Sequence, residues 1–300
     1  MEYEDDLNQQ GSTTKYDCLL FDLDDTLYPY SSGIAGHITS NIQEYMSQKL
    51  GVDQSKVVDM CYVLYKYYGT TLAGLRAIGY HFDYDDYHGF VHGTLPYELL
   101  KPDPVLRNLL LSFPIRKVVF TNSDKAHTYE VLGRLGLEDC FDGIICFETL
   151  NTAHRSTVSQ AEITKNTSDC RDSVSSMISG SEIFDIMEYS RQSNHGSTLP
   201  KTPIVCKPFE EAFEKTFKIA EINPHRTLFF DDSVRNLLTS AQMGLHTVLV
   251  GKSERPKGVD FALECIHNIK EAFPELLEAE DKSKNTRYSQ EVAIETSVIA

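Results

Sequence analysis

Short apolar runs alternate with longer amphipathic segments over much of the chain. Apolar runs bounded by polar residues predict strands over 16–24, 116–121, 143–148, 227–231 and 246–251. Apolar residues recurring three or four positions apart predict helices over 123–135, 208–222, 233–243 and 267–278. Short buried strands that alternate with helices are typical of a parallel sheet covered on both faces. We therefore predict an α/β fold with a Rossmann-like sheet.

The long interval between the first two predicted strands, residues 33–112, is helical in character. Its first stretch places five apolar side chains on one helical face: Ile34, Ile38, Ile42, Tyr45 and Met46. Gly51 is expected to end this helix. A second stretch with the same spacing follows, and a third begins after two prolines near residue 103.

Three segments lack this regularity. Residues 1–14 and 279–300 are polar and predict disordered tails. Residues 151–203 are rich in Ser, Thr and Asn and have no sustained periodicity except near "EIFDIMEY". Because a long unstructured loop is unusual inside a compact domain, we interpret 151–203 as a flexible surface insertion, with a lid or recognition flap as the alternative.

The charge and cysteine content limit the partners and the compartment. The net charge of −16 argues against broad contact with nucleic acid or an anionic membrane. The N-terminus does not read as a signal peptide, and no apolar run reaches the length of a membrane span. Seven cysteines without a C-x-x-C pair favour reduced thiols, and we expect a cytoplasmic protein, with a nuclear location as the alternative. The composition does not indicate an oligomeric state.

Carboxylates and hydroxyls cluster directly after several predicted strands. The first strand is followed by three aspartates, the second by a Thr-Asn pair, and the fourth by two aspartates; the residues are Asp22, Asp24, Asp25, Thr121, Asn122, Asp231 and Asp232. Ligands of open parallel sheets bind beyond the carboxyl ends of the strands, so these groups should meet at one edge. Such a concentration of negative charge calls for a cation, and Mg²⁺ is the hard ion that prefers carboxylate, carbonyl and phosphate oxygens.

The spacing of Asp22 and Asp24 points to chemistry as well as to metal binding. Residues two apart along an extended chain point to the same side, so both carboxylates could face one reacting centre. Two carboxylates in different surroundings can divide the work of nucleophile and general acid/base.

These stretches resemble the four motifs of the haloacid dehalogenase superfamily, in the same order. The first motif is similar to "FDLDDTL", the second to "VVFTNSD", the third to "VCKPFEEAF" and the fourth to "TLFFDDSVRN". The resemblance implies that Asp22 is a nucleophile that becomes an aspartyl phosphate, and that Asp24 is the general acid/base. The presence of Asp24 resembles the phosphatase and phosphomutase branches.

The resemblance also implies the remaining roles. Mg²⁺ would be held by Asp22, Asp231 and the backbone carbonyl of Asp24. Thr121, Asn122 and Lys207 would bind or neutralise the phosphate. Asp232 would orient Lys207 or a metal-bound water.

A helical cap is a further implication. Residues 29–100 would form a cap inserted after the first strand, with 15–28 and 101–278 forming the core domain.

Stretches such as "FDLDDTLYPYSSGI" and "FVHGTLPYELLKPDP" look like the plant and fungal branch that resembles pyrimidine 5′-nucleotidases.

We therefore expect a Mg²⁺-dependent phosphatase that hydrolyses a small phosphorylated metabolite, with a pyrimidine nucleoside 5′-monophosphate as the expected substrate. The alternatives within enzymes are a phosphatase for FMN or a sugar phosphate and a phosphomutase. A non-catalytic binding protein on the same fold is disfavoured, because all the motif residues are present.

Some aromatic side chains could contact a nucleotide. Tyr28, His92 and Tyr97 are candidates, although a structural role is the more frequent one for such residues. The histidines are not expected to form a zinc site.

Overall fold

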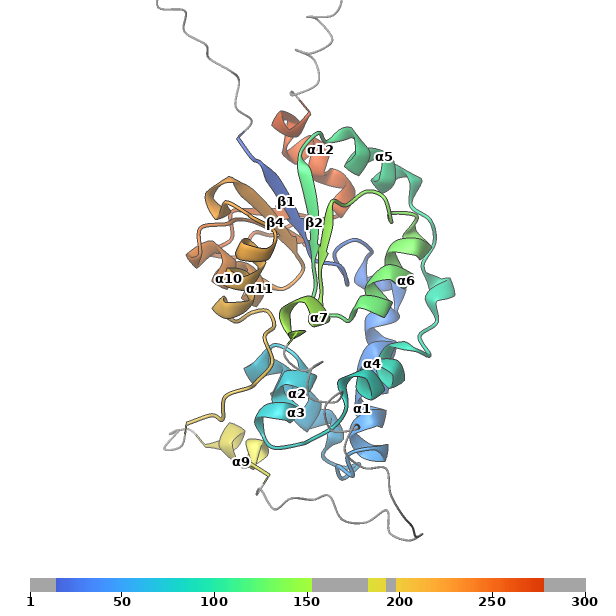
Figure 1. The fold of residues 1–300 in the computed structure, drawn as a ribbon, viewed down its shortest axis with the longest axis vertical. Helices are drawn as coiled ribbons and strands as arrows, with labels where there is room; N and C mark the ends of the chain where they lie inside the picture. Colours follow the sequence, from blue (N-terminus) through green and yellow to red (C-terminus); the bar gives the residue numbers. More distant parts are fainter. Residues whose placement is uncertain (1–14, 153–182, 193–197, 278–300) are drawn as a thin grey trace, which may run out of the picture.

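The computed structural model describes residues 15–152, 183–192 and 198–277 and contains a six-stranded, entirely parallel sheet (Figure 1). The strands are β1 (Cys18–Phe21), β2 (Arg116–Phe120), β3 (Gly143–Ile145), β4 (Thr227–Asp231), β5 (His246–Val250) and β6 (Phe261–Leu263). Their order across the sheet is β3-β2-β1-β4-β5-β6. The predicted fold class is confirmed.

Helices cover both faces of the sheet because the side chains of each strand alternate between them. In β1, Leu19 and Phe21 pack on one side with α5 (Pro104–Ser112), α6 (Lys125–Leu135) and α12 (Ile269–Ala272). Cys18 and Leu20 pack on the other side with α10 (Glu210–Ile219) and α11 (Val234–Gln242). All four residues are buried, as expected for a central strand.

The sequence missed or misplaced three elements. Strand β6 was not predicted, because three residues are too short to show a period. The strand predicted over 143–148 ends at Ile145, and the short helix α7 (Phe147–Leu150) begins two residues later. The helix predicted over 267–278 is split into η5 (Ile266–Asn268), α12 and η6 (Pro274–Leu276). Pro274 disfavours helical backbone at Phe273, which is extended in φ at −135°.

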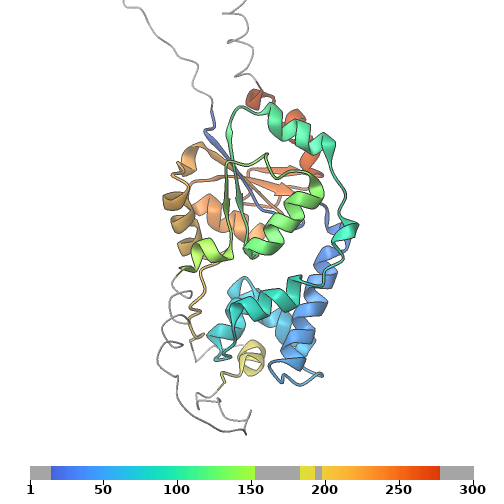
Figure 2. The same cartoon turned by 45° about the vertical axis from the view of Figure 1, so that its right-hand side comes forward.

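Four helices between β1 and β2 pack together beyond the carboxyl edge of the sheet (Figures 1 and 2). They are α1 (Ile34–Gln48), α2 (Val57–Tyr68), α3 (Thr71–Ala77) and α4 (Tyr84–His92). Their apolar faces form a cluster separate from the two that line the sheet. We refer to these helices as the cap. Short 3₁₀ helices complete the described elements: η1 (Tyr30–Ser32), η2 (Tyr97–Leu99) and η4 (Pro224–Arg226). No helix in the described ranges has the length and apolarity needed to cross a membrane.

Part of the predicted insertion 151–203 belongs to the cap. Helix α9 (Ile186–Arg191) buries Ile186 and Tyr189 in the cap cluster, and the rings of Tyr67 and Tyr189 meet edge to face with centroids 5.7 Å apart. The backbone N–H of Phe184 donates to the Ile78 carbonyl at 3.0 Å. The flexibility expected for 153–182 and 193–197 concerns residues outside the described ranges.

The segment 198–206 then follows the cap back to the core. The Tyr68 hydroxyl donates to the Pro200 carbonyl at 3.0 Å, and the Thr202 hydroxyl donates to the Ala73 carbonyl at 2.8 Å. The Cys206 thiol lies 3.5 Å from the Tyr68 carbonyl. Residue 207 follows directly.

Gly69, which follows α2, lies where the cap backbone passes close to the core backbone at Lys207. It has φ +80°, and an added Cβ would lie 2.3 Å from the Lys207 carbonyl oxygen. We expect Gly69→Ala to lower the free energy of unfolding by at least about 2–5 kcal/mol, since left-handed strain and overpacking add. Gly51→Ala is the matched control, because φ is +68° there and nothing lies within 4 Å of the added Cβ. It should cost only about 1–2 kcal/mol. Equal losses in urea denaturation would contradict the steric account.

Candidate active site

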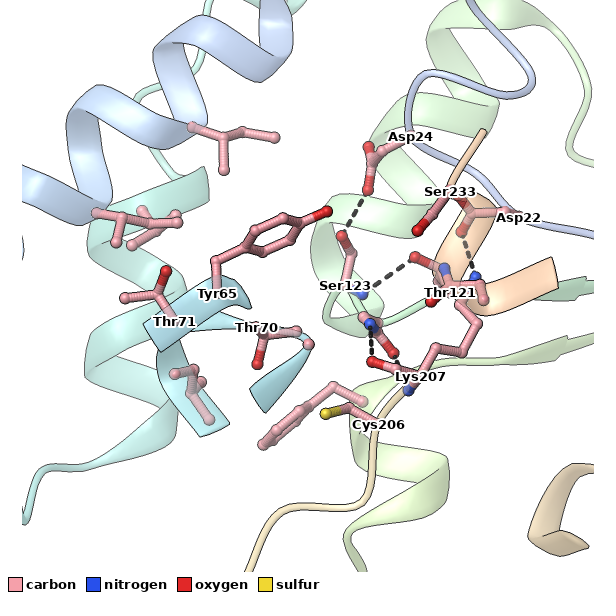
Figure 3. Close-up of a pocket in the computed structure, with 18 of the residues that line it drawn as sticks. Asp22, Asp24, Tyr65, Thr70, Thr71, Thr121, Ser123, Cys206, Lys207 and Ser233 are labelled. Atoms are coloured by element: carbon pink, nitrogen blue, oxygen red, sulfur yellow. Dashed lines mark hydrogen bonds and ion pairs between the residues drawn. The ribbon is translucent and has the colours of Figure 1, made fainter. Parts of the chain in front are cut away.

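The carboxyl ends of three neighbouring strands bring the predicted site residues together (Figure 3). Asp22 follows β1, Thr121 follows β2, and Asp231 is the last residue of β4. The backbone N–H of Asp22 donates to the Phe230 carbonyl at 2.8 Å, which continues the ladder of the parallel strands as far as the site. Lys207 enters this edge from the segment that leaves the cap.

The Lys207 ammonium lies at the centre of the site and is 1% exposed. Its Nζ donates to Asp22 Oδ1 at 2.7 Å, to Asp231 Oδ2 at 2.8 Å and to the Phe120 carbonyl at 2.8 Å. An ammonium group has three N–H donors, so all of them are used. One cation therefore joins β1, β2 and β4.

The charges in this group do not balance. Burial lowers the pKa of Lys207, but the two neighbouring carboxylates outweigh that effect and raise it. Burial raises the pKa of Asp22 well above its ordinary value, and the charge of Lys207 only partly offsets this. Burial and the charge of Asp231 raise the pKa of Asp232 to about 7. Three carboxylates facing one ammonium leave an excess of negative charge.

The same three carboxylates are arranged to hold a cation. Oxygen atoms of Asp22, Asp231 and Asp232 lie within 4.8 Å of one another. Asp231 is held in place by the backbone N–H of Ser233 at 2.8 Å and by the Asn236 amide at 3.0 and 3.1 Å. The residues fit a hard divalent ion, because they offer only oxygen donors and carry uncompensated charge.

Asp24 points toward α6 and is bonded by three donors. The hydroxyls of Tyr28 and Ser123 each donate to it at 2.6 Å, and His127 Nε2 lies 2.7 Å from Asp24 Oδ1. Burial raises the pKa of Asp24, but the charge and hydrogen bond of His127 have the opposite effect, and the net pKa is lowered. Asp24 in turn raises the pKa of His127 against its burial. The Tyr97 hydroxyl lies 2.8 Å from His127 Nδ1.

Asn122 fixes the backbone of Lys207. The Lys207 N–H donates to Asn122 Oδ1 at 2.8 Å, and Asn122 Nδ2 donates to the Lys207 carbonyl at 3.0 Å. The role that the family resemblance implies for Asn122 concerns its backbone N–H, so this side-chain contact is additional. Thr121 is 1% exposed, and its hydroxyl accepts from the Ser123 N–H at 3.0 Å.

A cavity of about 260 Å³ lies between these groups and the cap. Asp22, Asp24, Thr121 and Lys207 line its core side. The cap side is largely apolar and aromatic, with Ile38, Ile42, Tyr65, Leu72, Tyr87 and Val91 (Figure 3 labels Tyr65). The cavity thus joins a charged end to an apolar end.

The three aromatic side chains considered as nucleotide contacts have different positions. Tyr28 is 3% exposed and bonds Asp24, and Tyr97 bonds His127. Among the three, only His92 lines the cavity. His92 also belongs to a second cluster with His88 and Asp124. His88 and His92 have the H-x-x-x-H spacing, which the expectation of no zinc site overlooked.

The chain is similar to several known proteins, although no family model matches it. It is 32% identical over 132 residues to "Phosphate metabolism protein 8" of Saccharomyces cerevisiae, and the match spans 41% of each protein. A HAD phosphatase from Thermococcus onnurineus has a TM-score of 0.47 at 15% identity, covering 86% of this chain and 97% of that one. L-2-haloacid dehalogenase from Xanthobacter autotrophicus has a TM-score of 0.46 at 12% identity, covering 86% and 98%.

Lys207 should be required for stability as well as for any chemistry at this site. We expect Lys207→Met to lower the free energy of unfolding by about 3–5 kcal/mol, because Asp22 and Asp231 lose their buried counter-charge. A triple variant that also carries Asp22→Asn and Asp231→Asn should recover much of the loss. Urea denaturation without divalent ions measures both. A triple variant no more stable than the single one would mean that charge is not the cause.

Proposed function

We propose that the chain is a phosphatase of the haloacid dehalogenase superfamily, which hydrolyses a small phosphomonoester through an aspartyl phosphate on Asp22. The observation that carries this proposal is the buried Lys207 ammonium fixed between Asp22 and Asp231 at the edge where Thr121 also lies. A relative concerned with phosphate metabolism supports the reaction class. A non-catalytic binding protein would not need this nucleophile–lysine pair.

In the first step, an Asp22 carboxylate oxygen attacks phosphorus and the bond from phosphorus to the ester oxygen breaks. Lys207 reduces the repulsion between the carboxylate and the incoming phosphate, and the Thr121 hydroxyl and the Asn122 N–H bind the phosphate oxygens. The leaving oxygen takes a proton from Asp24. His127 Nε2 lies 2.7 Å from Asp24, and the charge of Asp24 raises the pKa of His127 despite its burial, so His127 is placed to supply this proton.

In the second step, a water oxygen attacks the phosphorus, and Asp24 accepts a proton from that water. The bond between Asp22 and phosphorus breaks, which releases inorganic phosphate and restores the carboxylate. Asp24 can serve in both directions because its hydrogen-bond donors hold it at one place in the cavity wall.

Mg²⁺ would be held by the side chains of Asp22 and Asp231 and the backbone carbonyl of Asp24, with Asp232 beside them. It would supply positive charge that balances the three carboxylates and screens the phosphate. Asp232 would orient Lys207 or a water on the ion.

We further propose a pyrimidine nucleoside 5′-monophosphate as the substrate. The apolar and aromatic cap side of the cavity, opposite the charged end, supports a ligand with a phosphate at one end and a flat ring at the other. FMN, a sugar phosphate and a phosphomutase reaction are the alternatives. The proposed domains are the core, 15–28 and 101–278, and the cap, 29–100.

Asp22→Asn should abolish turnover, because the amide is a poor nucleophile of nearly the same shape. We expect kcat to fall at least about 10³-fold with folding retained. Asp142→Asn is the matched control, since Asp142 accepts a hydrogen bond from the Lys117 N–H at the opposite end of the sheet. It should keep normal turnover. Phosphate release with Mg²⁺ present measures both, and near-normal activity of Asp22→Asn would refute the nucleophile assignment.

A panel of phosphate esters tests the substrate separately. UMP and CMP should have a higher kcat/KM than FMN, sugar phosphates and a small generic ester, because only the nucleotides pair a flat base with a short ribose phosphate. Equal turnover across the panel would retain the phosphatase and exclude the nucleotidase. Isomerisation of a sugar phosphate without phosphate release would indicate a mutase.

A further inference from the structure

A second group of metal-ligating side chains lies where the cap meets the core. His88 and His92 stand one turn apart on cap helix α4, and Asp124 caps the N-terminus of core helix α6. One ligand atom from each residue lies within 4.8 Å of the other two. His92 Nδ1 is hydrogen-bonded to Asp124 Oδ2, and His88 Nδ1 lies 3.5 Å from the same oxygen.

His88 is buried without a hydrogen-bond partner. Its side chain is 10% exposed, and neither Nδ1 nor Nε2 is hydrogen-bonded within the described part of the chain. The ring stacks on His92 with centroids 5.7 Å apart and meets the edge of Phe147 at 4.7 Å. A buried imidazole normally has a hydrogen-bond partner or a ligand on at least one ring nitrogen, so the two nitrogens of His88 point to a ligand.

The surroundings favour a cation in the same place. Asp124 is oriented by the backbone N–H of His127, which donates to Oδ1 at 3.1 Å, and its second oxygen faces the histidines. A second cavity, distinct from the one at Asp22, is lined by both histidines and by Asp124. It is also lined by Asp85, Glu130 and Glu148. Glu130 is paired with Arg134 at 2.8 Å, so the negative charge on this side comes from Asp85 and Glu148.

We propose that His88, His92 and Asp124 bind a divalent transition-metal ion of the Zn²⁺ class. Two imidazole nitrogens and one carboxylate oxygen suit such an ion, whereas Mg²⁺ prefers the all-oxygen group at Asp22, Asp231 and Asp232. Three protein ligands leave a coordination position for water or a further ligand. Since two ligands come from the cap and one from the core, the bound ion cross-links them beside the cavity. This proposal does not depend on the phosphatase reaction.

Co²⁺ is the probe, because tetrahedral coordination gives it strong visible absorption whereas octahedral oxygen sites give little. The full chain is freed of metal with a chelator and titrated with Co²⁺ in excess Mg²⁺. We expect one strongly absorbing Co²⁺ per chain, displaced by Zn²⁺. His88→Gln, which removes no hydrogen bond, should weaken Co²⁺ binding at least tenfold. Asp231→Asn, at the other site, should leave the absorption intact.

Two outcomes would overturn the proposal: absorption unchanged by His88→Gln, or no absorption with Co²⁺ in several-fold excess over the folded protein. If His88→Gln fails to fold, histidine ring NMR of the unmodified chain decides. Zn²⁺ should then shift the resonances of His88 and His92 and leave that of exposed His225 in place. Shifts confined to His225 would also count against the site.

Discussion

The arrangement of the central strands depends on one ammonium group that lies among oxygens from three of them. Lys207 bonds Asp22 after β1, the Phe120 carbonyl on β2 and Asp231 at the end of β4. A buried lysine is costly without partners, and buried carboxylates are equally costly without a cation, so each requires the others. Because β2, β1 and β4 are neighbours in the sheet, the strand order and the site are consequences of the same arrangement.

The cap supplies the other half of the site. The core edge carries nearly all of the charge, whereas the helices above it contribute aliphatic and aromatic surface to the cavity. In the phosphatase that we propose, this division would separate two tasks, since core residues would act on a phosphate that many metabolites share while cap residues would distinguish the rest of the molecule. His127 and Tyr97 extend the polar network behind Asp24, where neither touches the cavity.

The sequence predicted those site residues that follow strands, because parallel strands end at one edge whatever the length of chain between them. Asp22, Thr121 and Asp231 are of this kind. Lys207 follows no strand, and only the resemblance to a family indicated it. The partners of Asp24 could not be predicted, since Ser123 and His127 are about a hundred residues away and meet it only in the folded chain. Strand β6 is too short to have a period, and α9 joins the cap through tertiary packing alone. The sequence contains the H-x-x-x-H spacing of His88 and His92, but it could not indicate Asp124, which meets the two histidines only where α4 lies against α6 in the folded chain.

The route of the chain into Lys207 has a mechanical consequence. Pro200 and Thr202 are hydrogen-bonded to helices α2 and α3, whereas the backbones of Val205 and Lys207 are held to the core by the side-chain amides of Asn151 and Asn122. Within this segment, a rigid-body rotation of the cap would therefore concentrate its torsional change between Thr202 and Val205. The lysine would keep its position among the oxygens while the preceding residues moved, so opening and closing need not disturb the charge at the centre.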